Sequence, residues 1–240
     1  MAFIGIIPAR YASTRFPGKP LALINGIPMI QRVYEQVIQT PLFDFVIVAT
    51  DDERIRQVVN DFGGNAMMTS PEHQSGTDRC GEVAQVLELK NEDIVINIQG
   101  DEPFIRKEEI ELLAQQFHNQ NVSIATLVKK LEIDFEDISN PNLVKVVFDK
   151  NGKALYFSRY AIPFVRSKNN AKNVHYKHIG MYGYRYDTLR QIIQLSKTPL
   201  EDAENLEQLR WLESGFSIHI AECHYESLAI DTPDDLLKIN

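Results

Sequence analysis

The first half of the chain alternates short apolar segments with longer segments whose apolar residues recur every three or four positions. The apolar segments are rich in Ile and Val and predict strands buried on both faces; they are residues 3–9, 45–50 and 93–99, with a weaker one at 65–69. The segments of helical spacing are residues 27–39, 51–64, 77–89 (with Thr77 as the expected cap) and 107–119. This alternation predicts a mostly parallel sheet that is covered by helices on both faces.

The pattern changes after residue 120. Strand-like segments joined by short turns predict either antiparallel additions to the sheet or a small β extension; they are residues 122–131, 143–149, 153–163 and 178–186. Late strands are expected at 217–223 and 226–230, and helices at 188–195, 206–215 and 232–239. The polar, Asn-rich residues 166–176 predict an exposed loop or arm. Because no linker divides the chain, we expect one α/β domain over residues 1–240 with a β-rich insertion at about 150–186.

The composition of the chain argues against several classes of function. The formal net charge of −8 argues against a general nucleic-acid or anionic-membrane binder. The two cysteines, Cys80 and Cys223, have no metal-type spacing and predict reduced thiols. The sequence has neither a secretory leader nor an apolar run of about 18 residues. We therefore expect a cytoplasmic protein with no nucleic-acid partner and no stable membrane insertion.

Positive charge gathers on the loop that follows the first predicted strand. The first 34 residues contain four cations and no acid, and three of these cations, Arg10, Arg15 and Lys19, lie in this loop. Residues 16–19 predict a turn in which Gly18 can adopt a positive φ. A loop at the carboxyl end of a parallel strand is a usual ligand site, so a triphosphate is the expected ligand. A solvated basic loop is the alternative, and neither a Walker loop nor a G-x-G-x-x-G pattern is present.

Two carboxylates follow predicted strands. Asp101 comes just after residues 93–99, and Asp231 stands between a late strand and the last predicted helix. If the two meet beside a triphosphate, they suit Mg²⁺, which takes one or two carboxylates together with phosphate oxygens. Alternatively, each carboxylate serves only its own turn or helix.

Several segments together resemble one family. They are IIPARYASTRFPGKPL, HQSGTDR, VINIQGDEP, NPNLVKVVFD, ALYFSRYAIP, HIGMYGYR, LEQLRWLE and DTPDDL, which extend from residue 4 to residue 236. The chain resembles the 3-deoxy-D-manno-octulosonate (Kdo) cytidylyltransferases, also called CMP-Kdo synthetases. The resemblance implies a three-layer nucleotide-diphospho-sugar transferase fold. It also implies the reaction CTP + Kdo → CMP-Kdo + pyrophosphate, which serves lipopolysaccharide core synthesis, with Mg²⁺ as cofactor.

The resemblance also implies roles for individual residues. Nucleotide binding is expected of Ala9, Arg10, Ser13, Arg15, Lys19, Ser75 and Arg79. Sugar binding is expected of Gln99, Arg159, His178, Tyr182, Glu207 and Gln208. The magnesium ligands would be Asp101 and Asp231, and these two with Arg10, Arg15 and Lys19 would be the catalytic residues. The family also forms homodimers through the region of residues 154–163.

The sequence is compatible with other substrates and other functions. The sugar could be an 8-amino analogue of Kdo or another 2-keto acid sugar. Taken alone, His178 and Tyr182 are more typical of a half-buried pair on one face of a strand. A non-catalytic nucleotide-binding regulator would lack the full set of cations and carboxylates, and a glycosyltransferase would usually carry a D-x-D motif, which residues 95–103 lack.

Overall fold

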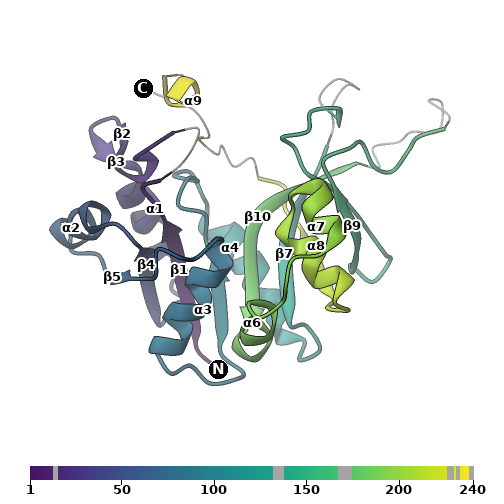
Figure 1. Ribbon diagram of the computed structural model, residues 1–240, viewed down its shortest axis with the longest axis horizontal. Coiled ribbons are helices and arrows are strands. Elements are labelled where there is room, and N and C mark those ends of the chain that lie inside the picture. Colours follow the sequence, from purple (N-terminus) through teal and green to yellow (C-terminus); the bar gives the residue numbers. More distant parts are fainter. Residues whose placement is uncertain (13–15, 132–137, 167–174, 226–229, 231–232, 238–240) are drawn as a thin grey trace. The chain divides into compact units, whose positions relative to one another are not determined.

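A computed structural model describes residues 1–12, 16–131, 138–166, 175–225, 230 and 233–237. Contacts divide the chain into two compact units (Figure 1). The first contains Met1–Glu111, Tyr184–Ile193 and Glu226–Asn240, and the second contains Leu112–Gly183 and Gln194–Tyr225. The chain passes repeatedly from one unit to the other, so the units are not successive stretches of sequence. That residues 1–240 behave as one domain stays a prediction.

Parallel strands form the centre of the first unit. They are β1 (Phe3–Ala9), β4 (Phe45–Thr50), β5 (Ala66–Met68) and β6 (Ile94–Asn97), and they lie in the order β6-β1-β4-β5. In this register Ile6 pairs with Ile47 on one side and with Asn97 on the other. The predicted parallel sheet is confirmed by this pairing. Nearly all residues of β1, β4 and β6 are buried, as expected of Ile- and Val-rich strands that are covered on both faces.

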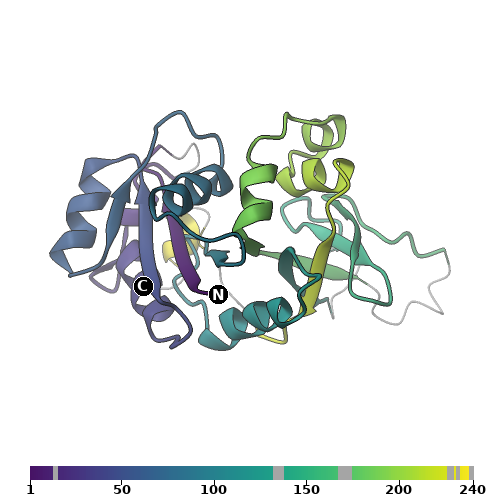
Figure 2. The ribbon, with the colours of Figure 1, turned by 90° about the horizontal axis from the view of Figure 1, so that it is seen from below.

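Helices cover both faces of these strands. The helices that contribute to this unit are α1 (Met29–Ile38), α2 (Glu53–Asp61), α3 (Gly76–Val86), α4 (Lys107–Gln115), α6 (Tyr186–Ile192) and α9 (Pro233–Leu237). Pro8 meets Gly76 at the start of α3, whereas Gly100 lies near Ile7 and near Ile30 of α1. Successive residues of a strand face opposite sides, so α3 and α1 cover opposite faces of β1 (Figure 2).

The start of α3 corrects one prediction. Ser75, and not Thr77, is the N-cap: its side chain accepts a hydrogen bond from the Asp78 amide, and the Asp78 carboxylate accepts one from the Ser75 amide. This reciprocal arrangement satisfies two amides that the first turn of a helix would leave unpaired. Thr77 is buried within the first turn instead.

The second unit contains β7 (Ile124–Lys130), β8 (Lys145–Phe148), β9 (Ala154–Ser158), most of β10 (Tyr176–Arg185) and β11 (Ile218–Glu222). Strand β11 is parallel to β7, whereas β8 is antiparallel to both β9 and β10. The predicted antiparallel strands are therefore confirmed here. Helices α7 (Pro199–Glu204) and α8 (Glu207–Glu213) pack together, and the sequence pattern does not predict α7.

The remaining elements are short. They are two 3₁₀ turns, Lys19–Leu21 and Gln116–His118, and a hairpin of β2 (Leu23–Ile24) and β3 (Ile27–Pro28). The strand expected at 226–230 lies almost wholly outside the described residues. In the part of the chain that the structure describes, no helix is both long and apolar enough to cross a membrane.

Candidate functional site

The basic loop leaves β1 and closes as the predicted turn. Gly18 has a φ of +72°, and its amide donates to the Tyr11 carbonyl oxygen at 2.9 Å. The Lys19 amide donates to the Phe16 carbonyl oxygen at 3.2 Å, which completes the turn. Arg10 is exposed at the start of this loop, and Lys19 lies at its end. Ser13 and Arg15 lie outside the described residues.

The loop meets the carboxylate turn that follows β6. The Lys19 Nζ donates to Asp101 Oδ2 at 2.6 Å, and the Lys19 side chain is only 9% exposed. The Ile230 amide donates to the Asp101 carbonyl oxygen at 3.1 Å. Asp231 lies outside the described residues, but its neighbour in the sequence is thus bonded to Asp101. The basic loop and the Asp101 turn therefore meet at one edge of the sheet.

An apolar cluster holds these segments together. Ile24, Met29 and Ile230 are fully buried against one another, and Phe16, Phe104 and Leu236 pack around them. The cluster joins Phe16 of the basic loop, Ile24 of β2, Met29 of α1, Phe104 after Asp101, Ile230, and Leu236 of α9. Because these segments are far apart in the sequence, burial of their apolar side chains helps to fix the relative positions of Lys19 and Asp101.

A pocket of about 330 Å³ opens at this edge, within the range of small-molecule sites. Seven of the predicted site residues line it: Ala9, Arg10, Lys19, Ser75, Arg79, Gln99 and Asp101. The described lining also contains Pro8, Pro20, His73, Gln74, Gly76 and Gly100. Its cations outnumber its one carboxylate, which favours an anionic ligand.

A second wall of the pocket is built by α3 and the segment before it. Arg79 is 3% exposed; its Nη1 donates to Thr69 Oγ1 at 2.6 Å and its Nη2 to Asp51 Oδ2 at 2.7 Å. Arg79 is thus an internal brace of this wall as well as part of its lining. Asp78 already pairs with the α3 N-terminus, which makes this wall a poorer place for a phosphate than the basic loop.

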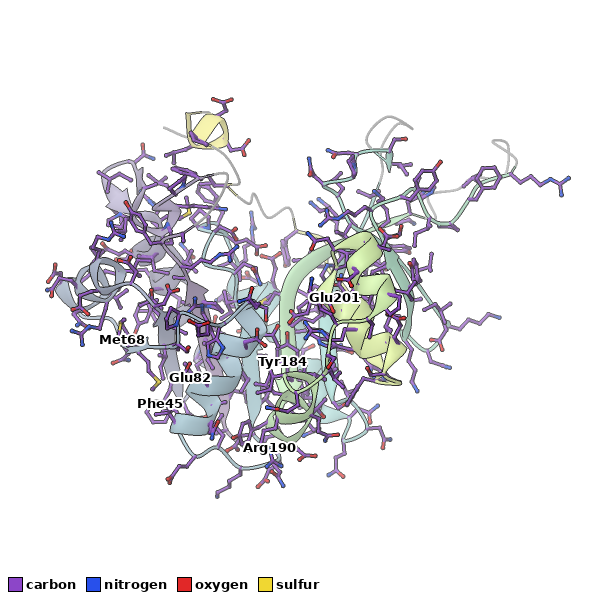
Figure 3. All side chains as sticks on the ribbon, viewed as in Figure 1. Phe45, Met68, Glu82, Tyr184, Arg190 and Glu201 are labelled. Atoms are coloured by element: carbon purple, nitrogen blue, oxygen red, sulfur yellow. The ribbon has the colours of Figure 1, made fainter. Side chains whose placement is uncertain are left out.

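His73 also lines the pocket, although the sequence predicts no role for it. Its Nε2 lies 2.5 Å from Glu82 Oε2, and the same carboxylate oxygen accepts from the Ser70 amide at 2.9 Å. Burial alone would raise the pKa of Glu82, but the Ser70 amide, His73 and Arg79 hold it below its ordinary value. Glu82 projects from α3 (Figure 3), nine residues after His73. The turns of α3 bring the Glu82 carboxylate back to the segment before the helix, where His73 lies.

In the second unit, His178 and Tyr182 share one face of β10, as predicted. Their ring centroids are 5.2 Å apart, and Tyr182 stacks edge-on against Trp211 of α8 at 5.1 Å. Burial lowers the pKa of His178 to about 3, so this imidazole is neutral at physiological pH. Burial, with the nearby Glu207 carboxylate, raises the pKa of Tyr182 well above its ordinary value, so this phenol keeps its proton.

The hydrogen bonds of Thr126 determine the tautomer of His178. The Thr126 hydroxyl lies 2.8 Å from the Met181 carbonyl oxygen, 3.1 Å from the Ile179 carbonyl oxygen and 2.9 Å from His178 Nε2. A carbonyl only accepts, and a hydroxyl has a single proton to donate. Thr126 therefore accepts from His178, whose Nε2 carries the ring proton and whose Nδ1 is an acceptor.

The other predicted sugar-binding residues of this unit lie near α7 and α8. The guanidinium of Arg159 donates to three main-chain carbonyls, those of Glu204 at 2.7 Å, Pro141 at 3.1 Å and Asn205 at 3.2 Å. Glu207 lies 3.4 Å from Arg210 Nη2, and Gln208 is buried. Arg159 is thus part of the frame of this unit, and the sugar-binding roles stay predictions.

A metal ion would find only part of its ligands among the described residues. No cluster of three or more His, Cys, Asp or Glu side chains occurs within them. Asp101 is nevertheless a partly exposed carboxylate in the lining of the pocket, and carboxylate oxygens are the ligands that Mg²⁺ prefers.

Comparisons with known proteins agree with this geometry. The cytidylyltransferase family model matches residues 4–220. The chain is 54% identical to a 3-deoxy-manno-octulosonate cytidylyltransferase of Parabacteroides distasonis, with 99% of this chain and 96% of the relative covered. It is 51% identical to the enzyme of the same name from Thermodesulfovibrio yellowstonii, over 98% and 96% of the two chains.

A solved structure is similar throughout. The CMP:2-keto-3-deoxy-manno-octonic acid synthetase complexed with CTP is 44% identical, with a TM-score of 0.93, and the match covers 100% of this chain and 97% of that one. The order of strands and helices, the cationic loop beside Asp101 and this near full-length identity lead to one conclusion: the chain belongs to the 3-deoxy-manno-octulosonate cytidylyltransferase family.

Proposed function

We propose that this protein transfers the cytidylyl group of CTP to Kdo, which yields CMP-Kdo and pyrophosphate. The observation that supports this most directly is the 2.6 Å contact of Lys19 with Asp101, which brings the anion-binding loop and a metal-type carboxylate into one pocket. Relatives that are about half identical over nearly their full length have this activity in their names.

The pocket binds the triphosphate of CTP at its basic end. Arg10 offers a forked set of N–H donors, and the Lys19 ammonium has three, so a bond to Asp101 does not prevent Lys19 from donating to a phosphate oxygen. Because the Lys19 side chain is 9% exposed, its charge acts in a medium that screens less than water does. The wall of α3, with Ser75 and His73, then faces the nucleoside.

The reaction joins two anions, and this chain's cations lower the repulsion between them. The anomeric hydroxyl of Kdo attacks the α-phosphorus, a new P–O bond forms, and the bond to pyrophosphate breaks in line with it. The hydroxyl proton passes to solvent. Arg10 and Lys19 stabilise the charge that grows on the departing pyrophosphate. Mg²⁺ bound by Asp101 and Asp231 would neutralise phosphate charge and lower the pKa of the attacking hydroxyl.

The resemblance assigns sugar binding to several side chains, among them His178 and Tyr182 of the second unit. The neutral His178 provides a hydrogen bond and no charge, so His178 suits a sugar hydroxyl better than the sugar carboxylate. Tyr182, which keeps its proton, also provides hydrogen bonding without charge. The carboxylate charge must therefore be balanced by an arginine, a lysine or the metal.

The test is pyrophosphate release from the purified protein. CTP with Kdo and Mg²⁺ should give steady release, and omission of any one of the three should abolish it. Lys107, an exposed lysine at the start of α4, is a matched control for Lys19, because Lys107→Ala should leave the rate unchanged whereas Lys19→Ala should not. Release with an 8-amino analogue or another 2-keto acid sugar, but not with Kdo, would reassign the substrate. CTP binding without release from any sugar would refute the catalytic role.

We also propose a homodimer that forms through the β9 region. Leu155, Tyr160 and Phe164 are 61%, 79% and 85% exposed, which is unusual for large apolar side chains so close in sequence. Light scattering on the eluting protein should give twice the mass of one chain, and Tyr160→Asp with Phe164→Asp should halve it. A wild-type protein that elutes as a monomer at micromolar concentration would refute the proposal.

Finally, we propose that the protein acts in the cytoplasm. Cys80 and Cys223 are both buried thiols that form no disulfide, as expected in a reducing compartment. Fractionation of cells that express the chain at native levels would place it in the soluble cytoplasmic fraction, and recovery from the cell envelope would contradict this.

A further inference from the structure

Arg54, which has no role in the function described above, lies against the base of the basic loop. Its guanidinium carbon is 3.3 Å from the centroid of the Tyr11 ring. Tyr11 is the second residue after β1 and directly follows Arg10, and Arg54 belongs to the first turn of α2. A cation over an aromatic face at this distance is an attractive contact.

Asp52 holds this guanidinium in place. Arg54 Nε donates to Asp52 Oδ1 at 2.9 Å, and Arg54 Nη2 donates to Asp52 Oδ2 at 2.6 Å. Asp52 is also the N-cap of α2, because its Oδ1 accepts from the Arg54 amide at 2.9 Å. The forked pair orients the guanidinium relative to the start of α2, where the guanidinium lies over the Tyr11 ring.

The Tyr11 ring in turn contacts the turn that carries Lys19. A Cβ built on Gly18 would lie 3.0 Å from the Tyr11 ring, so this ring and the Gly18 backbone touch. The Gly18 amide also donates to the Tyr11 carbonyl oxygen. Contacts therefore run from Asp52 through Arg54 and Tyr11 to Gly18, whose neighbour Lys19 lies 2.6 Å from Asp101.

The Arg54 side chain is 58% exposed, and an ion pair as exposed as this one contributes little to the free energy of unfolding. A purely stabilising role thus predicts almost no effect when Arg54 is removed. Arg54 contacts Tyr11, however, and Tyr11 lies in the sequence between the two pocket cations Arg10 and Lys19. The loss of Arg54 is therefore expected to change ligand binding more than stability. Resting on the function proposed above, we propose that Arg54 is a positioning residue that holds the triphosphate-binding loop in its binding geometry through Tyr11.

The test compares Arg54→Ala with Arg56→Ala. Arg56 is on the same helix, is similarly exposed and pairs with Glu53, so its loss removes the same charge without touching Tyr11. Loss of a cation–π contact at an exposed site, about 1 kcal/mol, predicts a Kd for CTP raised about 3- to 10-fold in Arg54→Ala. In Arg54→Ala we also expect a parallel rise of KM for CTP, a smaller change of kcat and a melting temperature within a few degrees of wild type. In Arg56→Ala we expect an unchanged Kd for CTP.

Two further variants test the route through Tyr11. Arg54→Lys keeps a cation near the ring but loses the forked pair, so its Kd should lie between those of wild type and Arg54→Ala. Tyr11→Ala should weaken CTP binding, and adding Arg54→Ala to it should change little more. Equal CTP affinities in Arg54→Ala and Arg56→Ala would overturn the proposal, as would independent, additive effects of Tyr11→Ala and Arg54→Ala.

The Kd for CTP is measured by calorimetry without sugar. It therefore stays interpretable if the protein binds CTP but releases no pyrophosphate with Kdo. That outcome would refute the proposed reaction. The Kd values of the Arg54, Arg56 and Tyr11 variants for CTP would still decide the role of Arg54. If wild type does not bind CTP, both proposals fail.

Discussion

Replacing Lys19 with Ala tests the electrostatics of the site most directly. The Lys19 Nζ is 2.6 Å from Asp101 Oδ2, and the Lys19 side chain is nearly buried, whereas that of Asp101 is 34% exposed. The variant loses one cation that would face the triphosphate. It also leaves the Asp101 carboxylate unbalanced by Lys19 in a pocket that must accept a polyanion. Both changes act in the same direction.

The magnitude follows from these distances. Two unit charges about 4 Å apart interact by about 4 kcal/mol at the effective dielectric of a partly exposed protein site. Loss of one such contact to a developing charge usually costs about 3–4 kcal/mol of transition-state stabilisation. We therefore expect kcat/KM for CTP to fall about 10²- to 10³-fold in Lys19→Ala.

The assay is pyrophosphate release at limiting CTP with saturating Kdo and Mg²⁺. Lys19→Arg, which keeps the charge but changes its shape, should lose less activity than Lys19→Ala. Lys107→Ala controls for a general change of net charge, and circular dichroism checks that each variant is folded. A wild-type value of kcat/KM in Lys19→Ala would refute the reasoning, because a buried cation beside the reacting phosphates cannot be silent if the triphosphate binds there.

Three other perturbations test separate parts of the structure. Asp101→Asn should abolish turnover and its Mg²⁺ dependence while leaving the melting temperature within a few degrees; retained Mg²⁺-dependent turnover would exclude Asp101 as a metal ligand. The folded-state pKa of His178 is about 3 against about 6.5 when unfolded, so its contribution to stability is complete above pH 6.5 and declines as the pH falls toward 3. Urea titrations should therefore show wild type losing about 2 kcal/mol more than His178→Asn between pH 7 and pH 5, and parallel pH profiles would contradict the assignment. Gly100→Ala would place a Cβ 2.8 Å from the Pro8 carbonyl oxygen, a backbone atom, and should cost about 1–3 kcal/mol of unfolding free energy. A Gly100→Ala protein as stable to urea as wild type would show that crowding at Gly100 is unimportant.

Much of the fold can be predicted from local pattern. The strands at 3–9, 45–50 and 93–99 and the helices after them agree with the structure to within a few residues. Periodicity and short-range turn chemistry depend only on neighbours in the chain, which explains this agreement. The errors are also local. Thr77 was expected as the cap of α3 although Ser75 and Asp78 offer a reciprocal pair, and α7 begins at a proline in its first turn, a usual helix-start signal.

The candidate site was predictable only in part. The charge on the basic loop and the position of Asp101 after a buried strand are visible in the sequence, and the resemblance to a family names the remaining residues. The part played by His73 is not visible, because a histidine in a loop has no distinctive spacing until Glu82 is brought to within 2.5 Å of it. The main-chain contacts of Arg159 are equally hidden, since they involve carbonyls of three other residues.

By itself, the sequence determined the alternation of strands and helices, the concentration of cations after β1 and the family to which the chain belongs. Only the tertiary structure decided which of these groups meet: Lys19 with Asp101 across 82 positions of sequence, Arg54 with Tyr11, and His178 with Thr126. The physical reason is that such contacts depend on strand register and on the burial of apolar side chains such as Met29 and Ile230, which act between segments far apart in the chain.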